Sequence, residues 1–295
     1  METRESDFFQ EKTIGIVGLG LIGGSYAKGL RKIGVKHIIA VDRDKASLAK
    51  AKADGVIDTA LTEVGEGLKQ AHILIFCMPA KAIMDCIKEG IPYFKEDAVL
   101  TDVAGIKGTM AKEILDILPK QMDFISGHPM AGREGSGYDM ARADIFDNAN
   151  YIIVPDRRNQ QEHIDLVRHL ALALGCAHVV EVTPEEHDKL IAYTSSLPHV
   201  LATSLVNSEA MSGHTKYFVA GSFRDGTRVA DINAPMWTTL FMSNKENLLY
   251  EIERFQLALD SFKQMLAADD AAGMTKYLEQ ATTRRRELIH ETHTH

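Results

Sequence analysis

Apolar residues follow two different patterns in the first and second parts of this 295-residue chain. In the first part, short continuous apolar runs alternate with longer amphipathic stretches, which is typical of strands buried on both faces and connected by helices. The predicted strands are 13–17, 37–41, 73–77, 98–102, 151–155 and 178–182, and a further strand ends at Phe124-Ile125. This alternation predicts an α/β fold with a parallel, doubly wound sheet that binds ligands at its carboxyl edge.

The second part of the chain contains no strand pattern. Thr183 suits the N-cap of a helix, with Glu186 in the capping-box position three residues later. The rest reads as helices, including a long amphipathic pattern over 248–262. We therefore predict an α/β domain over 1–182 and an all-helical domain over 183–295. The helical part has more apolar residues than a few helices can bury alone, which predicts a homodimer.

Composition and charge exclude several classes of partner. The net charge is −8 and no basic block occurs before Arg284-Arg285-Arg286, so nucleic acid is not an expected partner. No apolar run approaches the roughly 18 residues that span a bilayer, so no membrane partner is expected. The three cysteines have no metal or redox spacing, and no signal peptide is recognisable. These features predict a cytoplasmic protein.

A glycine-rich turn after the first strand predicts dinucleotide binding. The strand runs into Gly18-Leu19-Gly20-Leu21-Ile22-Gly23, which opens a helix. Gly18 permits the tight turn, Gly20 lets a pyrophosphate approach the backbone, and Gly23 packs the helix on the strand. The free N–H groups and the dipole of the helix N-terminus favour the anion. The α/β domain is therefore predicted to be a Rossmann domain.

The end of the second strand indicates which dinucleotide is bound. Asp42 follows Gly23 by about 20 residues, where a carboxylate accepts bonds from the ribose 2′-hydroxyl and repels a 2′-phosphate. Arg43 beside it is able to pair with a phosphate, so NADP stays open as an alternative. The predicted cofactor is NAD. The carboxyl ends of two later strands add further predicted cofactor contacts: Met78, Pro79, Asp102 and Lys107.

Three further stretches carry candidate chemistry. His128 lies in the small, glycine-rich segment 126–137, expected just past the carboxyl edge of the sheet, where an imidazole suits proton transfer near neutral pH. His199 lies within a predicted helix, next to a proline that distorts the backbone. The polar segment 221–228, predicted to interrupt the helices, offers two arginines, which are preferred partners of carboxylates. Taken singly, each stretch is equally well explained by a purely structural role. Together with a cofactor domain, the three stretches predict a cationic pocket for a small acid.

These motifs resemble those of the prephenate dehydrogenases of tyrosine biosynthesis, from Ile14 to about Arg286. The motifs that carry the resemblance are Gly18 through Ser25, Asp102 through Gly108, Gly127 through Gly132, His187-Asp188, Leu197-Pro198-His199 and Phe223 through Arg228. The resemblance implies an enzyme that oxidises prephenate with NAD and releases carbon dioxide and 4-hydroxyphenylpyruvate. It also implies a Rossmann domain followed by an all-α dimerisation domain.

The resemblance assigns roles to individual residues. It implies that His128 bonds the ring hydroxyl of the substrate and accepts its proton, and that Arg228 grips a substrate carboxylate. Residues implied to line or close the same pocket are Glu134, His199, Gly221 and Trp237. The chain departs from the family at Gly105, where a serine is usual, and at Ser196, where histidine is frequent. A base and a cation suffice for this hydride transfer, so no metal is expected.

Three other functions remain alternatives at this point. The same chemistry on arogenate, the aminated analogue of prephenate, would need only a different response to an ammonium group. A β-hydroxyacid dehydrogenase would also join a Rossmann domain to helices, but such enzymes typically use a lysine of the helical domain. A silent NAD-binding sensor would retain the glycine-rich turn without catalysis, an idea to which Gly105 lends slight weight.

Overall fold

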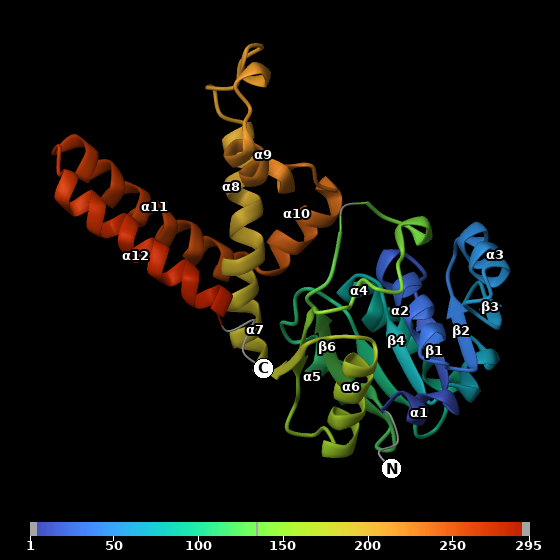
Figure 1. Cartoon of the computed structure of the whole chain (residues 1–295). Coiled ribbons are helices and arrows are strands. Elements are labelled where there is room, and N and C mark those ends of the chain that lie inside the picture. The colour runs from blue at the N-terminus through green and yellow to red at the C-terminus, as the bar shows by residue number, and fades with distance from the viewer. Residues whose placement is uncertain (1–4, 134, 291–295) are drawn as a thin grey trace. The chain divides into compact units, whose positions relative to one another are not determined.

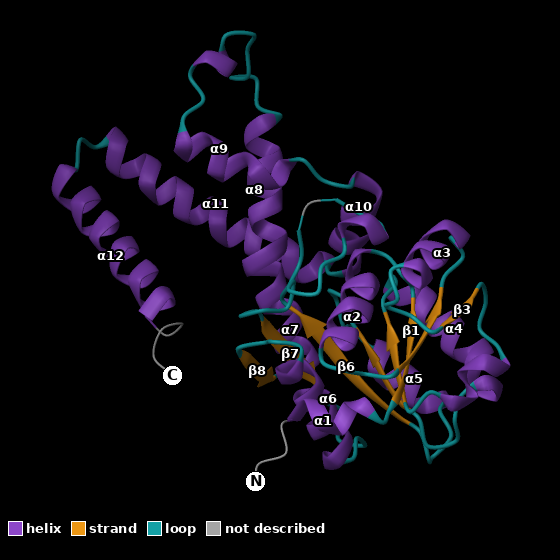
Figure 2. Cartoon of the chain, turned by 45° about the vertical axis from the view of Figure 1, so that its right-hand side comes forward, coloured by secondary structure: helices purple, strands orange, loops and turns teal. Residues whose placement is uncertain are grey.

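One eight-stranded sheet organises the first part of the chain, in the order β3-β2-β1-β4-β5-β6-β7-β8. The computed structural model describes residues 5–133 and 135–290 (Figures 1 and 2). The strands are β1 (Thr13–Val17), β2 (His37–Val41), β3 (Thr59–Leu61), β4 (Ile73–Phe76), β5 (Val99–Asp102), β6 (Asp123–Pro129), β7 (Asn150–Val154) and β8 (His178–Glu181). This confirms the predicted α/β architecture.

The sheet differs from the prediction in two respects. The sequence pattern missed β3, a three-residue edge strand without a buried residue that pairs only with β2. The prediction of a fully parallel sheet is wrong beyond β6, because β7 is antiparallel to β6 and β8 is parallel to β7. A parallel crossover normally contains a helix. The described residues between β6 and β7 include only a short 3₁₀ turn, Tyr138–Met140, so the chain returns antiparallel.

Helices cover both faces of the sheet and create two cores. The helices of this part are α1 (Glu5–Gln10), α2 (Leu21–Lys32), α3 (Lys45–Ala53), α4 (Ala80–Gly90), α5 (Met110–Ile117) and α6 (Gln161–Ala173). Because side chains alternate along a strand, Ile14 and Ile16 of β1 pack with α2 and α6, whereas Val17 packs on the opposite face with α4 and α5. Burial on both faces explains the continuous apolar runs.

After β8 the described chain is entirely helical, as predicted. The elements are α7 (Pro184–Ile191), a π-helical turn (Ala192–Ser196), α8 (Leu197–Val206), α9 (Gly221–Thr227), α10 (Ala234–Ser243), α11 (Lys245–Ala267) and α12 (Ala271–His290), with short 3₁₀ turns between them. The predicted cap of α7 is confirmed, because Thr183 Oγ1 accepts a hydrogen bond from the Glu186 amide at 3.2 Å. Segment 221–228, predicted as an interruption, instead forms α9 with Arg228 directly after it. No helix in the described ranges has the length and apolar character needed to cross a membrane.

The chain divides into two compact units that are not contiguous in sequence. The first extends to Ile191 and also includes Val229–Asn244, and the second consists of Ala192–Arg228 and the chain from Lys245. This division differs from the predicted boundary after residue 182. It does so because α7 and the residue after α10 are hydrogen-bonded to one another and to the loop that follows β5, as described below.

Candidate active site

His128 lies within β6, opposite Ile152 of β7. Its predicted position in a loop past the strand is therefore wrong, since the strand continues to Pro129. The first half of β6 pairs with β5 as far as Ile125, and its second half, from Ser126, pairs with β7. A strand holds a side chain more firmly than a loop does, and His128 is half-buried there.

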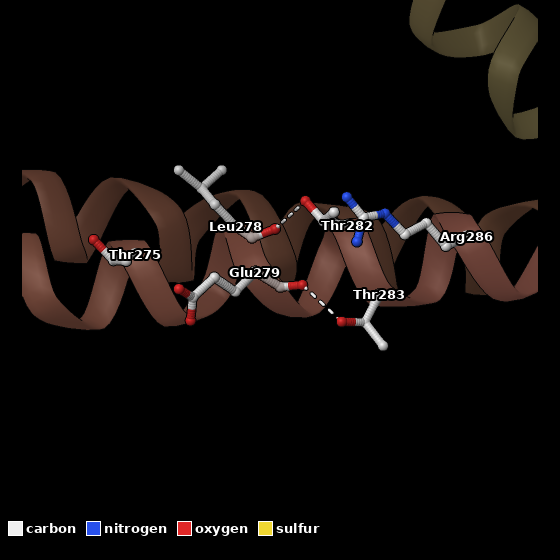
Figure 3. Close-up of a pocket in the computed structure, with 6 residues that line it drawn as sticks. All are labelled: Thr275, Leu278, Glu279, Thr282, Thr283 and Arg286. Carbon is white, nitrogen blue, oxygen red and sulfur yellow. Dashed lines mark hydrogen bonds between the residues drawn. The ribbon is translucent and has the colours of Figure 1, made fainter.

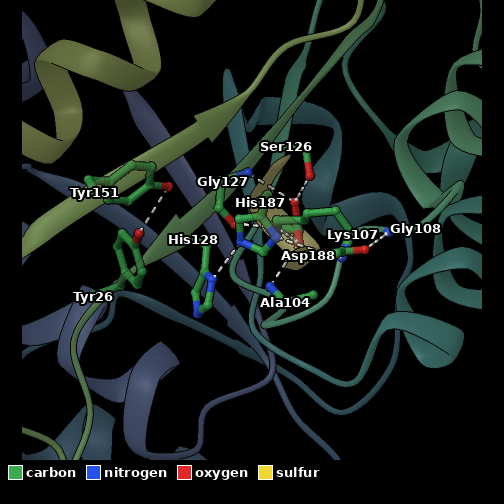
Figure 4. A network of polar contacts seen from close by, with 11 residues as sticks. Tyr26, Ala104, Lys107, Gly108, Ser126, Gly127, His128, Tyr151, His187 and Asp188 are labelled. Carbon is green, nitrogen blue, oxygen red and sulfur yellow. Dashed lines mark hydrogen bonds and ion pairs between the residues drawn. The ribbon is translucent and has the colours of Figure 1, made fainter. Parts of the chain in front are cut away.

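Two side chains, linked one to the next, fix the ring of His128 (Figure 4). His128 Nδ1 lies 2.9 Å from His187 Nε2, and His187 Nδ1 lies 2.7 Å from Asp188 Oδ1. An ionised carboxylate only accepts hydrogen bonds, so the proton of His187 is on Nδ1 and its Nε2 accepts. His128 must then donate from Nδ1. The remaining nitrogen of His128, Nε2, carries a lone pair and is the proton acceptor of the site.

Three hydrogen bonds, two from backbone amides and one from a side-chain amide, hold Asp188 in place. Its two carboxylate oxygens accept from the amides of Lys107 and Gly108 at 2.9 and 2.8 Å, and its carbonyl accepts from Asn244 Nδ2 at 2.7 Å. Burial opposes ionisation of Asp188, but the bonds from His187 and the two amides outweigh it and lower the pKa of the carboxyl. The carboxylate therefore stays charged and keeps His187 in the tautomer described above.

The surroundings of His128 favour its neutral form. Burial is the largest cause, and the nearby Lys107 ammonium and His187 add to it; together they hold the pKa of His128 well below its ordinary value of 6.5. A neutral imidazole accepts a proton, whereas an imidazolium does not. The site is thus prepared for general-base chemistry at neutral pH.

Position 105 adjoins the accepting nitrogen. A Cβ built on Gly105 would lie 3.8 Å from His128 Nε2 and 3.8 Å from Leu240 Cδ2 of α10. These are ordinary van der Waals distances, so a small side chain would fit, but glycine leaves no hydroxyl beside the base. Trp237, predicted to close the pocket, also lies on α10 and packs against Phe241, with ring centroids 5.3 Å apart and the ring planes tilted by 48°.

Two predicted cofactor residues are engaged elsewhere. The side chains of Asp102 and Lys107 are completely buried and form an ion pair, with Lys107 Nζ 2.7 Å from Asp102 Oδ2. Lys107 Nζ also donates to the carbonyl of Gly127 at 2.5 Å. Both side chains therefore point into the protein beneath His128.

The glycine-rich turn has the geometry that pyrophosphate binding requires. Gly18 has φ +96°, which strains any other residue. A Cβ on Gly23 would lie 1.8 Å from the Gly18 carbonyl oxygen, whereas a Cβ on Gly20 would meet no described atom within 4 Å. Gly20 is the N-cap of α2 and makes no side-chain cap hydrogen bond, and Leu21 and Ile22 follow it. The open space at Gly20 therefore leaves room for an anion next to the helix N-terminus.

Asp42 connects the glycine-rich turn to the end of β2. Its two carboxylate oxygens accept from the amides of Leu19 and Asp44, at 2.5 and 2.8 Å. Arg43 is exposed beside it. After β4, Met78 is half-buried two residues past the end of the strand, and Pro79 precedes the first residue of α4.

Three predicted substrate residues belong to the second unit. His199 donates from Nδ1 to the Ser195 carbonyl at 2.8 Å, a bond made across the π-helical turn before α8. Gly221 is the first residue of α9, and Arg228 follows its last residue and is exposed. Glu134, also predicted to line the pocket, lies outside the described residues.

Sequence reasoning found His128 but missed the side chains that hold it. His187 and Asp188 were recognised only as a motif of the resemblance, and Ser126 and Asn244 were given no function. A histidine followed by an acid, in the first turns of a helix that directly follows the last strand, was a usable signal. The role of Asn244 had no comparable signal, because it depends on a contact between residues 56 positions apart.

Two family models match this chain. They are described as the prephenate dehydrogenase nucleotide-binding domain, over residues 26–181, and the prephenate dehydrogenase dimerization domain, over residues 183–280. The Bacillus subtilis prephenate dehydrogenase is 32% identical over 278 residues, which cover 91% of this chain and 74% of that protein.

Solved structures show the same likeness along nearly the whole chain. The A. aeolicus prephenate dehydrogenase in complex with hydroxyphenyl propionate and NAD⁺ has a TM-score of 0.85 and 30% identity, and the match covers 94% of this chain and 98% of that one. The Synechocystis arogenate dehydrogenase has a TM-score of 0.80 and 28% identity, with 94% and 99% covered. On this evidence, the chain belongs to the prephenate dehydrogenase family.

Proposed function

We propose that this protein is an NAD-dependent prephenate dehydrogenase that converts prephenate to 4-hydroxyphenylpyruvate and carbon dioxide. The observation that carries the proposal is the orientation of His128. Asp188 and His187 hold its ring so that Nε2 is an acceptor, and burial keeps the ring neutral. A base of this kind is what oxidation of a ring alcohol needs.

The proposed reaction begins at the ring hydroxyl of prephenate. NAD, when bound, supplies the acceptor for the hydride. His128 Nε2 takes the hydroxyl proton while the carbinol hydrogen leaves as hydride, so that the C–O bond gains carbonyl character. The bond between the ring and its carboxylate then breaks and carbon dioxide leaves. The electron pair of that bond restores the aromatic ring, and the ring oxygen takes back a proton to give the phenol of 4-hydroxyphenylpyruvate. Arg228 holds a substrate carboxylate in our proposal, since a guanidinium matches that group bidentately.

The residues of the first unit fit a dinucleotide. The turn at Gly18, the open space at Gly20 and the uncapped start of α2 suit a pyrophosphate. Beside the end of β2 lies a hollow of about 250 Å³, whose lining includes Asp44, Lys50 and Asp139. Lys50 is paired with Asp139, so Asp44 is the remaining charged residue of this lining, and a carboxylate disfavours a 2′-phosphate.

We expect NAD to be preferred over NADP by at least about tenfold in kcat/KM, or roughly 1.4 kcal/mol. The reason is repulsion between Asp42 and the 2′-phosphate. Initial rates measured with each cofactor test this, and Asp42→Asn should narrow the ratio. Equal use of both cofactors by the unchanged enzyme would mean that Arg43 governs the ribose site.

The proposed function is tested by mixing the protein, NAD and prephenate and following the absorbance of NADH. We expect NADH and 4-hydroxyphenylpyruvate to form in equal amounts. Arogenate is the second candidate substrate, supported by the structural likeness to the Synechocystis arogenate dehydrogenase. NADH formation with arogenate but not with prephenate would make arogenate the substrate. No NADH formation with either compound would indicate an NAD-binding sensor.

We expect a homodimer of about twice 32.6 kDa, measured by analytical ultracentrifugation or light scattering. Large apolar side chains of α11 and α12 are exposed in one copy: Leu257, Leu259, Leu266, Leu278 and Leu288. Figure 3 shows a hollow on this surface whose six lining residues, Leu278 among them, all come from α12. A monomer at micromolar concentration would contradict this expectation.

We also propose a cytoplasmic location, which the three cysteines support. All of them are free thiols, and such residues persist in a reducing compartment. Burial raises the pKa of Cys86 to about 11 and that of Cys176 to about 12, which makes the thiolate scarce and oxidation slow.

A further inference from the structure

A buried ion pair bonds the two residues that precede the base. Lys107 Nζ and Asp102 Oδ2 are 2.7 Å apart, and neither side chain is exposed to solvent. Burying two charges costs free energy that their attraction does not always repay, and apolar residues of similar size are often as stabilising. The role of this pair therefore depends on the other hydrogen bonds that its two side chains make.

These bonds hold the peptide that precedes His128. Asp102 Oδ1 accepts from Ser126 Oγ at 2.9 Å and from the Gly127 amide at 3.1 Å, and Lys107 Nζ donates to the Gly127 carbonyl at 2.5 Å. The backbone pairing between β5 and β6 has already ended at Ile125. From Ser126 on, hydrogen bonds to Asp102 and Lys107 therefore hold this side of β6 in place of backbone pairing with β5. Figure 4 labels Lys107, Ser126 and Gly127 of this network.

Lys107 also holds the ring of the base from the other side. Its backbone amide donates to Asp188 Oδ1 at 2.9 Å, and the same oxygen accepts from His187, which in turn bonds His128 Nδ1. One residue therefore connects the backbone before His128 with the side chains that set its tautomer. A displacement of Lys107 would disturb both.

The charge of the pair acts on the base as well. The groups that face His128 are the Lys107 ammonium after β5, His187 of α7 backed by Asp188, and Asp102 of β5 through Gly127. The ammonium disfavours a second positive charge on the ring and so lowers the pKa of His128, in the same direction as burial. On α10, the apolar Leu240 Cδ2 lies 3.8 Å from a Cβ built on Gly105, the position that adjoins His128 Nε2.

We propose that Lys107 and Asp102 form a positioning pair that fixes the backbone and the tautomer of His128, rather than contacting the cofactor as the sequence predicted. This inference rests on the proposed function only for the expected fall in kcat. The pair sets the geometry of the base, and a misplacement of the order of 1 Å at a reacting group lowers turnover by about 10²-fold.

The test uses Lys107→Met, Asp102→Asn and the double variant in the full-length protein, with Lys112→Met as the matched control on exposed α5 surface. Each single change leaves an unpaired charge or amide and is expected to lower stability. The double variant removes both charges of the pair together and is expected to fold. We expect kcat of the double variant to fall about 10- to 100-fold, with the Kd for NAD within about threefold of the unchanged enzyme.

The decisive readout is the titration of His128, followed by NMR and assigned with His128→Asn. In the double variant the pKa of His128 should rise, and the acid limb of kcat/KM should move to higher pH with it. Because the NMR titration needs no substrate, it tests the pair even if prephenate and arogenate both fail to react. An unchanged titration with wild-type kcat would overturn the proposal, and so would loss of NAD binding with kcat retained at saturating NAD.

Discussion

Replacing His128 by asparagine is expected to lower kcat by roughly 10²–10⁴, the usual range for loss of a general base. Asparagine is polar and of similar size, so it still bonds His187, but it does not accept a proton near pH 7. KM should change little, because the lost interaction belongs to the transition state. Stopped assays of 4-hydroxyphenylpyruvate at saturating prephenate and NAD measure this effect.

The pH profile of the unchanged enzyme checks the same base. Only neutral His128 accepts a proton, and its pKa lies well below 6.5, so kcat/KM should fall only as the pH drops below that value. His169→Asn, on exposed α6 surface, is the control and should leave both rate and profile unchanged. If His128→Asn retained wild-type turnover, the histidine would be structural and His199 would become the candidate base.

Removal of the Arg228 guanidinium should raise KM for prephenate much more than it lowers kcat. A charge-assisted contact to a carboxylate is worth about 1.5–3 kcal/mol, so Arg228→Ala should raise KM by roughly 10- to 150-fold. The contact persists from ground state to transition state, and turnover at saturation is therefore affected less. Initial rates over a wide range of prephenate concentrations separate the two effects.

Arg224 provides the matched control for this experiment, since it lies one turn earlier on α9 and is also exposed. Arg224→Ala should leave KM within about twofold of the unchanged enzyme. Arg228→Lys keeps the charge but loses the planar fork, so its KM should lie between those of the alanine variant and the unchanged enzyme. A rise in KM for Arg224→Ala but not for Arg228→Ala would assign the carboxylate to the other arginine.

Local patterns in the sequence predicted most of the fold. The continuous apolar runs of β1, β2 and β4 identify strands buried on both faces, and the glycine-rich turn identifies the first βα unit. The pattern does not report strand direction, so the reversal at β7 was missed. Strand β3 was missed for a different reason: it is three residues long, and none of its side chains is buried.

The candidate site was predictable only in its main residues. His128 and the glycines stand in motifs whose composition reflects their chemistry. Asp102 and Lys107 stand in such a motif too, but a motif does not tell whether a charged side chain faces a ligand or the interior. The links from Lys107 to Asp188 and from Asp188 to Asn244 join residues 81 and 56 positions apart, which no local pattern encodes.

The discontinuity of the first unit limits how this protein can be cut or recombined. The chain leaves this unit after Ile191, returns for Val229–Asn244 and leaves again. A fragment ending near residue 182 would lack His187 and Asp188, and one ending at residue 191 would lack Asn244. Neither fragment would contain the complete set of bonds around the base. Gene fusion or domain exchange at a single junction would therefore not transfer a working site. The two units are accordingly expected to be inherited together during evolution.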